Sequence, residues 1–203
     1  MRLRFFVLAP ATNLIRFFSF LNPMQFFYYT PIPKVFHSFE LDALFKECLF
    51  CKTDLMEEGT NYLIEKAFKK SEVIFEYAMC FDCRTKVQAE LSKQSRKLID
   101  NYFNEHLDLD EHREEMLETY GHDVAGWISH CLIKGTPVKE CNEYQIYGLC
   151  VDRDIMLTGL PYALSGEAID DIIQLLSSES LGVIEEFSMK LFDLDIPAPV
   201  LIL

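Results

Sequence analysis

Residues 48–83 read CLFCKTDLMEEGTNYLIEKAFKKSEVIFEYAMCFDC, and this stretch decides the fold. It opens and closes with a C-x-x-C pair, Cys48 with Cys51 and Cys80 with Cys83, and 28 residues lie between the pairs. Two thiolates separated by two residues can bind one metal ion from a tight turn, and two such pairs complete the tetrahedron that zinc prefers. The sequence therefore predicts one structural Zn²⁺ held by these four side chains.

The residues between and after the pairs indicate how the cysteines are positioned. Residues 60–68 (TNYLIEKAF) and 71–79 (SEVIFEYAM) alternate with period two, which predicts two strands joined by a short turn. Apolar residues then recur at helical spacing, namely Val87, Leu91, Leu98, Ile99, Tyr102 and Phe103. A helix beginning near Asp82 directs its positive end at the thiolates and favours their ionised form.

This order of a cysteine knuckle, a hairpin and a second pair opening a helix resembles the treble-clef zinc fingers. The resemblance covers about residues 46–104 and is carried by Cys48, Cys51, Cys80 and Cys83. It implies metal binding, and members of this group serve protein binding, nucleic-acid binding or catalysis. The treble-clef nucleases need a histidine-rich catalytic strand. Residues 60–79 contain no histidine, so no nuclease activity is implied.

Residues 77–83 (YAMCFDC) also look like the strand, C-x-x-C and helix of thioredoxin-like redox enzymes. That interpretation leaves Cys48 and Cys51 unexplained. It also needs a βαβ unit, whereas the strand before Cys80 is predicted to belong to a hairpin. Zinc binding is therefore favoured, and a dithiol redox protein remains the alternative.

The second half of the chain looks like a worn copy of the first. The matching segments are 131–134 (CLIK) with 48–51 (CLFC), 143–146 (EYQI) with 61–64 (NYLI), 154–157 (DIML) with 72–75 (EVIF), 161–165 (PYALS) with 79–83 (MCFDC), and 176–180 (LSSES) with 91–95 (LSKQS). The pattern predicts that each half contains a knuckle-like turn, a hairpin, a helix, a serine-rich break and a second helix. A serine of the break is expected to cap the second helix. In this alignment Lys134, Tyr162 and Ser165 replace three ligands, and Cys131 alone remains.

Three further groups of residues have metal-binding or anion-binding alternatives. The residues His130, Cys131, Cys141 and Cys150 offer suitable ligand atoms for a second metal at spacings that are not standard, so buried unpaired cysteines are favoured. The residues His106, Asp108, Asp110 and His112 could form a catalytic metal site, but residues 110–120 are typical of an acidic, solvated helix ended by Gly121. Ser165-Gly166-Glu167 could bind an anion at a helix start, although a plain N-cap explains Ser165 equally well.

Residues 1–36 differ from the rest, with no acid, four bases and ten Phe or Tyr residues. A signal peptide is one interpretation, but Ala9-Pro10-Ala11 lies inside the apolar stretch instead of after it. Residues 17–33 are too short and too rich in proline to span a membrane. Translation that begins at Met24 is a third interpretation. We expect an extension outside the fold, and membrane contact by residues 1–33 is not favoured.

The distribution of charge along the chain indicates which class of macromolecule the protein could bind. Residues 101–203 carry five bases and 20 acids, and such a field repels phosphate backbones. The expected partner is a basic protein surface that docks near Asp108, Asp110, Glu111, Glu114 and Glu115, unless these acids serve solubility alone. Nucleic-acid binding through Lys66, Lys69, Lys70, Arg84 and Lys86 ranks last, because acids are interleaved with these bases.

Together these patterns predict an α+β protein of two treble-clef-like modules joined by an acidic helical linker, with only the first module stapled by zinc. The expected parts are an extension (1–36), a zinc module (37–104), the linker (105–126) and a degenerate repeat (127–203), in which Trp127, Ile128 and Leu132 form core. Seven cysteines with metal-type spacing favour a reducing, cytoplasmic setting. A zinc-stabilised interaction or adaptor protein is the expected function. The alternative is an enzyme, either a dithiol redox protein or a metal hydrolase using the cluster between His106 and His112.

Overall fold

A computed structural model describes residues 28–192 of the protein, so residues 1–27 of the predicted extension lie outside the described residues. The prediction was wrong for residues 28–36, because Tyr28–Pro31 pairs with Asp154–Leu157 in the sheet and Phe36 is buried in the core. Within that range the protein is a mixed α+β fold, as predicted, with one six-stranded antiparallel sheet and six α-helices. The elements in chain order are β1 (Tyr28–Pro31), η1 (Lys34–Phe36), β2 (Asn61–Lys69), β3 (Glu72–Cys80), α2 (Phe81–Glu90), α3 (Lys93–His106), α4 (Leu109–Tyr120), α5 (Val124–Trp127), η2 (Val138–Glu140), β4 (Glu143–Val151), β5 (Asp154–Leu157), β6 (Tyr162–Ser165), α6 (Gly166–Gln174) and α7 (Ser178–Phe192).

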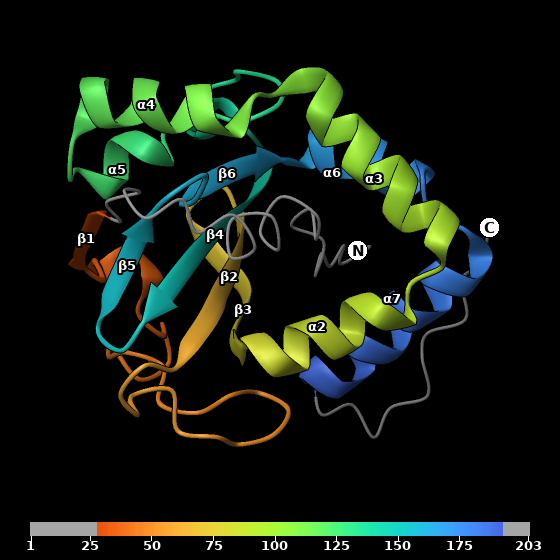
Figure 1. The fold of residues 1–203 in the computed structure, drawn as a ribbon, viewed down its shortest axis with the longest axis horizontal. Helices are drawn as coiled ribbons and strands as arrows, with labels where there is room; N and C mark the ends of the chain where they lie inside the picture. The colour runs from red at the N-terminus through yellow and green to blue at the C-terminus, as the bar shows by residue number, and fades with distance from the viewer. Residues whose placement is uncertain (1–27, 193–203) are drawn as a thin grey trace.

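One sheet contains strands from both halves of the chain (Figure 1). Its order is β1-β5-β4-β2-β3, and β6 also pairs with β4. Strand β4 pairs with β2 along its whole length, from Glu143 opposite Lys69 to Val151 opposite Asn61. The sequence predicted the two hairpins but not this pairing, which joins the two halves into one sheet.

The hairpin registers of the two halves correspond residue by residue. The pairs are Tyr62 with Cys80 and Phe68 with Val73 in the first half, and Tyr144 with Ser165 and Cys150 with Ile155 in the second. Strands β5 and β6 together therefore lie along β4 as β3 lies along β2. The first hairpin is one continuous ladder with a single bulge, whereas residues 158–161 interrupt the second.

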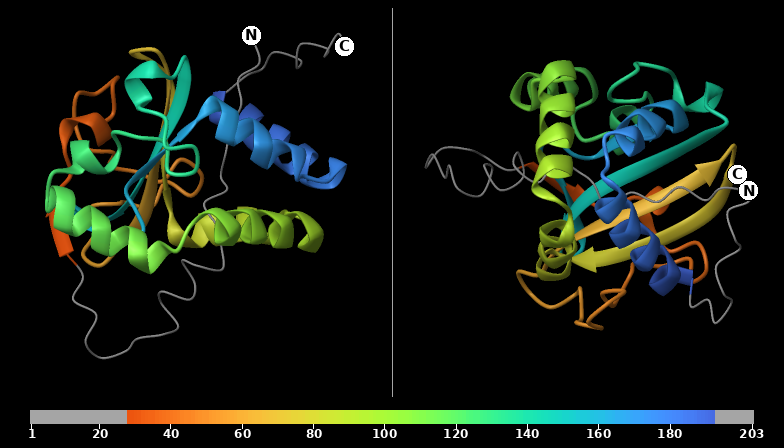
Figure 2. Two further views of the ribbon diagram at one scale, coloured as in Figure 1. Left: turned by 90° about the horizontal axis from the view of Figure 1, so that it is seen from above. Right: turned by 90° about the vertical axis from the view of Figure 1, so that its right-hand side faces the viewer.

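Strand β2 is buried on both faces, although its period-two pattern predicted one buried face. Residues 62–68 are all buried, including the charged side chains of Glu65 and Lys66. The Lys66 ammonium pairs with the Glu76 carboxylate at 2.9 Å, and the Tyr77 hydroxyl donates a hydrogen bond to the Glu65 carboxylate. Helices α2, α3, α6 and α7 lie to one side of the sheet (Figure 2). The central strand thus carries buried charges that are paired inside the protein. The period-two pattern of the sequence did not indicate that these charged residues are buried.

The second helix of each half begins at a serine, as predicted. The Ser92 hydroxyl accepts from Ser95 N at 3.1 Å and caps α3, while the Ser177 hydroxyl accepts from Ser180 N at 3.2 Å at the start of α7. The two caps also bond to each other reciprocally. Ser92 N donates to Ser180 Oγ at 2.9 Å, and Ser177 N donates to Ser95 Oγ at 2.8 Å. These four serines join the starts of α3 and α7.

The predicted acidic helix is present as α4. Asp108 caps it by accepting from Asp110 N and Glu111 N, and it ends at Gly121, whose φ of 54° suits glycine. Asp108, Asp110, Glu111, Glu114 and Glu115 are all exposed. In residues 28–192 no helix combines the length and the apolar character needed to cross a bilayer.

Candidate metal centre

The first cysteine pair lies in a tight loop before β2. Cys48 N donates to Thr53 O at 2.9 Å, which closes the turn that contains Cys51. Leu49 N donates to Ala78 O at 2.9 Å and ties this turn to the end of β3. The local hydrogen bonds therefore hold the first two thiols beside the strand that delivers the third.

The second pair spans the junction of β3 and α2. Cys80 is the last residue of the strand and the N-cap of the helix, and Cys83 lies in the first helical turn. Cys80 N donates to Cys48 Sγ at 3.4 Å, the kind of amide-to-sulfur bond that stabilises a thiolate. Because the strand runs directly into the helix, the positive end of α2 faces the four thiols, as predicted.

The four Sγ atoms all lie within 4.8 Å of one another, and Cys51 Sγ is 3.6 Å from Cys80 Sγ. Zinc–sulfur bonds of about 2.3 Å imply an edge of roughly 3.8 Å for a tetrahedron of sulfurs, so the thiols are spaced for one ion. Cys48, Cys80 and Cys83 are buried and Cys51 is exposed. The four predicted ligands thus form one group that could hold one metal ion, and zinc fits its all-sulfur ligand set.

The four thiols differ in acidity. Hydrogen bonding with Thr53, whose Oγ1 lies 3.1 Å from Cys51 Sγ, lowers the pKa of the Cys51 thiol to about 6. Burial raises the pKa of the Cys80 and Cys83 thiols above the ordinary value. A metal ion deprotonates coordinating thiols outright, so bound zinc would convert the buried pair to thiolates. Four thiolate ligands fill the coordination shell and leave no position for a reactive water, which is typical of a structural site.

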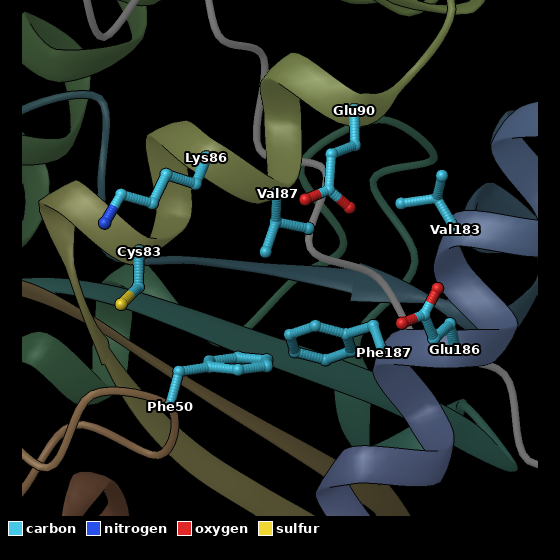
Figure 3. A pocket seen from close by; sticks show the side chains of 8 residues that line it. All are labelled: Phe50, Cys83, Lys86, Val87, Glu90, Val183, Glu186 and Phe187. Carbon is cyan, nitrogen blue, oxygen red and sulfur yellow. The ribbon is translucent and has the colours of Figure 1, made fainter.

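A groove of about 180 Å³ borders this centre between α2 and α7 (Figure 3). Cys83 lines one end, and the rings of Phe50 and Phe187 lie next to each other along one wall, with centroids 5.0 Å apart. Val87 and Val183 complete the apolar lining. The aromatic residue inside the first C-x-x-C pair is therefore packed against the last helix, which links the metal centre to the core.

The loop of the second half repeats the hydrogen bonds of the first. Cys131 N donates to Thr136 O at 2.8 Å, and Leu132 N donates to Ala163 O at 2.8 Å. Ser165 N donates to Cys131 Sγ at 3.2 Å, just as Cys80 N donates to Cys48 Sγ. The turns at Cys48 and Cys131 therefore have the same pattern of hydrogen bonds.

These bonds correct the alignment of the second half. Ser165 takes the place of Cys80, not of Cys83, and Ala168 takes the place of Cys83. Tyr162 lies where Tyr77 lies, so it does not replace a ligand. The signal was in the sequence, because residues 162–168 (YALSGEA) match 77–83 (YAMCFDC) without a gap once the interruption at 158–161 is placed before them. Ser165 Oγ accepts from Ala168 N at 3.3 Å, so Ser165 is the N-cap of α6.

An ion pair links the loop of Cys131 to α6 in the second half. Lys134, at the position of Cys51, reaches Asp171 of α6 at 2.5 Å, and the Tyr102 hydroxyl donates to the same carboxylate at 3.1 Å. The hydrogen bond from Lys134 lowers the pKa of Asp171. A surface ion pair contributes about 0.2–1 kcal/mol, far less than structural zinc.

The other metal candidates are not assembled. Within residues 28–192, the four cysteines form the single group of three or more Cys, His, Asp or Glu ligands that could hold a metal ion. Cys150 is fully buried in β4, and Cys141 Sγ bonds to Pro137 O at 3.6 Å. His106 Nδ1 lies 2.7 Å from Tyr102 O, whereas the His112 ring faces Trp127.

Three of the basic residues that were candidates for nucleic-acid binding form ion pairs within the protein or are buried. Lys66 pairs with Glu76, Lys69 pairs with Glu143 at 3.3 Å, and Arg84 is 1% exposed. Two of the five bases are therefore paired with acids, and a third is buried. Trp127 and Ile128 are buried, as predicted for core residues.

The chain was compared with protein-family models, with curated proteins and with solved structures, and no match was found.

Proposed function

We propose that the protein is an interaction or adaptor protein whose first half is held together by one structural zinc ion. The observation that carries this proposal is the convergence of the Sγ atoms of Cys48, Cys51, Cys80 and Cys83 within 4.8 Å. A module this small has too little apolar core to fold firmly alone, and a metal staple supplies the missing free energy. A saturated four-thiolate shell favours a structural role over a catalytic one.

The proposed zinc module is a treble clef. The loop with Cys48 and Cys51, the hairpin β2–β3 and helix α2 follow one another in the order typical of that class. Cys80 and Cys83 at the strand–helix junction supply the second pair of ligands. The observed elements support this assignment, and metal binding tests its main requirement.

The second half is proposed to be a degenerate copy of the same module. The support is the set of matching hydrogen bonds around Cys48 and Cys131, the matching hairpin registers, and the reciprocal bonds between the serine caps of α3 and α7. Two related modules that pair through β2 and β4 would form a pseudo-twofold arrangement inside one chain. In the second module the Lys134–Asp171 ion pair and the Ser165 cap lie at positions that correspond to metal ligands in the first.

The proposed partner is a basic protein surface that docks on α4. The acids Asp108, Asp110, Glu111, Glu114 and Glu115 are exposed on or beside one helix, within the part of the chain that carries most of the negative charge. Such a field steers the encounter with a positive surface and weakens as salt screens it, over about 8 Å at physiological ionic strength. The acidic helix is thus the surface that we expect a partner to approach first.

Reversing Glu111 and Glu114 to Lys is expected to slow association with a basic partner recovered from the native host by about 10-fold or more at low salt. Both side chains are exposed, so the thermal stability should change little. Association rates measured by surface plasmon resonance across a salt series test this. The matched control is Glu57→Lys with Glu58→Lys, the same charge change at exposed positions of the other half. Equal rates for the two double variants would contradict docking on α4.

A dithiol redox function is the second candidate. The observation in its favour is Cys51, which is exposed and has a thiol pKa of about 6. It is the weaker candidate because a zinc-bound thiolate is not free to attack a disulfide, and three of the four thiols are buried. The metal content of the native protein separates the two.

A further inference from the structure

Access to the four thiols of the candidate metal centre is uneven. Of the seven cysteines of the chain, all of them within residues 28–192, Cys51 alone is exposed. Cys48 is 0% exposed, and Cys80 and Cys83 are each 7% exposed. Cysteine oxidation is favoured by thiolate character and by exposure to solvent. Cys51 is therefore the sulfur of the cluster that a small oxidant in solution reaches first.

A second sulfur lies beside this exposed one. Cys51 Sγ is 3.6 Å from Cys80 Sγ, and the sulfurs of a disulfide are about 2 Å apart, so a shift of roughly 1.5 Å would join them. Cys51 lies in the turn before β2, whereas Cys80 is the last residue of β3. An exposed thiolate with a second thiol next to it is the arrangement typical of redox-sensitive cysteines.

The two remaining thiols of the cluster are less suited to bond with Cys51. Cys48 is fully buried, and its sulfur accepts a hydrogen bond from Cys80 N at 3.4 Å. Cys83 is held in the first turn of α2, whereas Cys80 precedes the helix as its N-cap. A bond from Cys51 to Cys80 therefore needs no movement of the Cys48 sulfur or of the first turn of α2.

We propose that this centre is a peroxide-sensitive switch, in which oxidation joins Cys51 to Cys80 and releases the metal ion. The inference rests on the proposed zinc site and adds a means of regulating it. Reduction of the disulfide restores the four thiols, so the site can bind zinc again.

Hydrogen peroxide is the oxidant, and the electrons balance over two steps. The Cys51 thiolate attacks one oxygen and the O–O bond breaks, which gives a Cys51 sulfenic acid and a hydroxide ion. The Cys80 thiolate then attacks the Cys51 sulfur, so that an S–S bond forms, the S–O bond breaks and a second hydroxide ion leaves. The two thiolates lose two electrons, and the peroxide gains them. Cys48 and Cys83 remain as ligands, whereas a structural zinc site needs four.

The size of the oxidant makes this reaction compatible with a coordinated cluster. Metal coordination and burial hinder the approach of a protein disulfide to these thiols. Hydrogen peroxide is little larger than water, so it can reach the solvent-facing side of the exposed Cys51 sulfur while the cluster is intact.

The fold indicates what the switch changes. The disulfide joins the turn before β2 to the junction of β3 and α2, so it keeps the two cysteine pairs together after the metal has left. Phe50 precedes Cys51 in the chain and packs against Phe187 of α7 (Figure 3). A shift of Cys51 toward Cys80 therefore alters the groove between α2 and α7, which Phe50 lines.

Zinc release from the purified full chain, in its zinc-loaded form, measures the first part of the proposal. Hydrogen peroxide is added in small excess, and a chromogenic chelator reports the zinc that becomes free. The expected result is loss of the bound zinc, followed by its recovery when dithiothreitol and zinc are added.

The position of the first disulfide measures the second part. Trypsin cleaves after Lys and Arg, so the first cysteine pair lies in peptide 47–52 and the second pair in peptide 71–84. After alkylation of the free thiols, mass spectrometry is expected to find these two peptides linked. Fragmentation of the linked peptides is expected to place the bond between Cys51 and Cys80.

Two histidine variants test the point at which the oxidant enters. A histidine nitrogen is also a ligand for structural zinc, so Cys51→His and Cys83→His can both keep the metal. The first variant removes the exposed thiolate, and the second removes a buried one and leaves Cys51 in place. Peroxide should release zinc about 10-fold or more slowly from Cys51→His than from Cys83→His, which should resemble the wild-type chain. If either variant fails to hold zinc, the position of the first disulfide in the wild-type chain decides.

Four outcomes would overturn the switch: zinc that stays bound after peroxide treatment, zinc loss without a disulfide, a first disulfide within one C-x-x-C pair, or equal release rates from the two histidine variants. The zinc content before oxidation tests the proposed function separately. A chain without zinc contradicts the structural site itself, whereas zinc that stays bound under peroxide contradicts the switch alone.

Discussion

Replacing Cys80 with serine is expected to abolish stoichiometric zinc binding and to unfold the first half of the chain. Cys80 ends β3, begins α2 and lies 3.6 Å from Cys51 in the thiol cluster, so it belongs to both the metal centre and the strand–helix junction. Binding free energies of structural zinc sites are on the order of 10–16 kcal/mol, and this free energy is shared with folding. Losing one ligand should therefore remove several kcal/mol, which is comparable to the whole stability of a small domain.

Metal content and the thermal unfolding curve, followed by circular dichroism, measure this effect. The control is Cys141→Ser, the same change at a partly exposed thiol outside the cluster. Its sulfur donates a weak bond to Pro137 O that serine can replace, so this variant should keep its zinc and its melting temperature. If Cys80→Ser retains the metal and melts with the control, the thiol cluster does not stabilise the fold.

The second large expected effect is an increase in the number of zinc ions bound per chain. The triple variant Lys134→Cys, Ser165→Cys and Ala168→Cys is expected to raise the zinc content from one ion to two per chain. Cys131 already accepts the amide of Ser165, as Cys48 accepts that of Cys80, so the backbone that would support four thiolates is in place. The variant loses the Lys134–Asp171 ion pair and the Ser165 cap, about 1–2 kcal/mol together, which bound zinc would exceed.

A matched triple variant tests the corrected alignment. Lys134→Cys, Tyr162→Cys and Ser165→Cys places thiols where the sequence-based alignment put the lost ligands. Position 162 lies opposite Tyr147 in the sheet, away from the start of α6, so this variant should not take up a second ion. A second zinc in the matched variant, or in neither variant, would argue against two copies of one module.

The sequence was sufficient to predict the four-cysteine cluster because its determinants are local. The spacing within each pair fixes two thiols on one turn, and the alternation in residues 60–68 and 71–79 predicts the hairpin that brings the pairs together. The caps Ser92, Asp108 and Gly121 also follow from local chemistry, since each satisfies backbone groups of its own helix.

The joining of the halves could not be read from the sequence. The pairing of β2 with β4 is decided by contacts between residues far apart in the chain. The sequence of neither strand indicates which strand it pairs with. Glu65 and Lys66 look like solvent-facing residues, and their burial depends on Tyr77 and Glu76 of the next strand.

The most direct test of the central claim is the ratio of zinc to protein in the native full chain, determined by elemental analysis after loosely bound metal has been removed. Four thiols within 4.8 Å in the first half, and one cysteine with Lys134, Ser165 and Ala168 in the second, predict a ratio close to one. A ratio near zero, in protein whose thiols are intact and reduced, would contradict the structural zinc site.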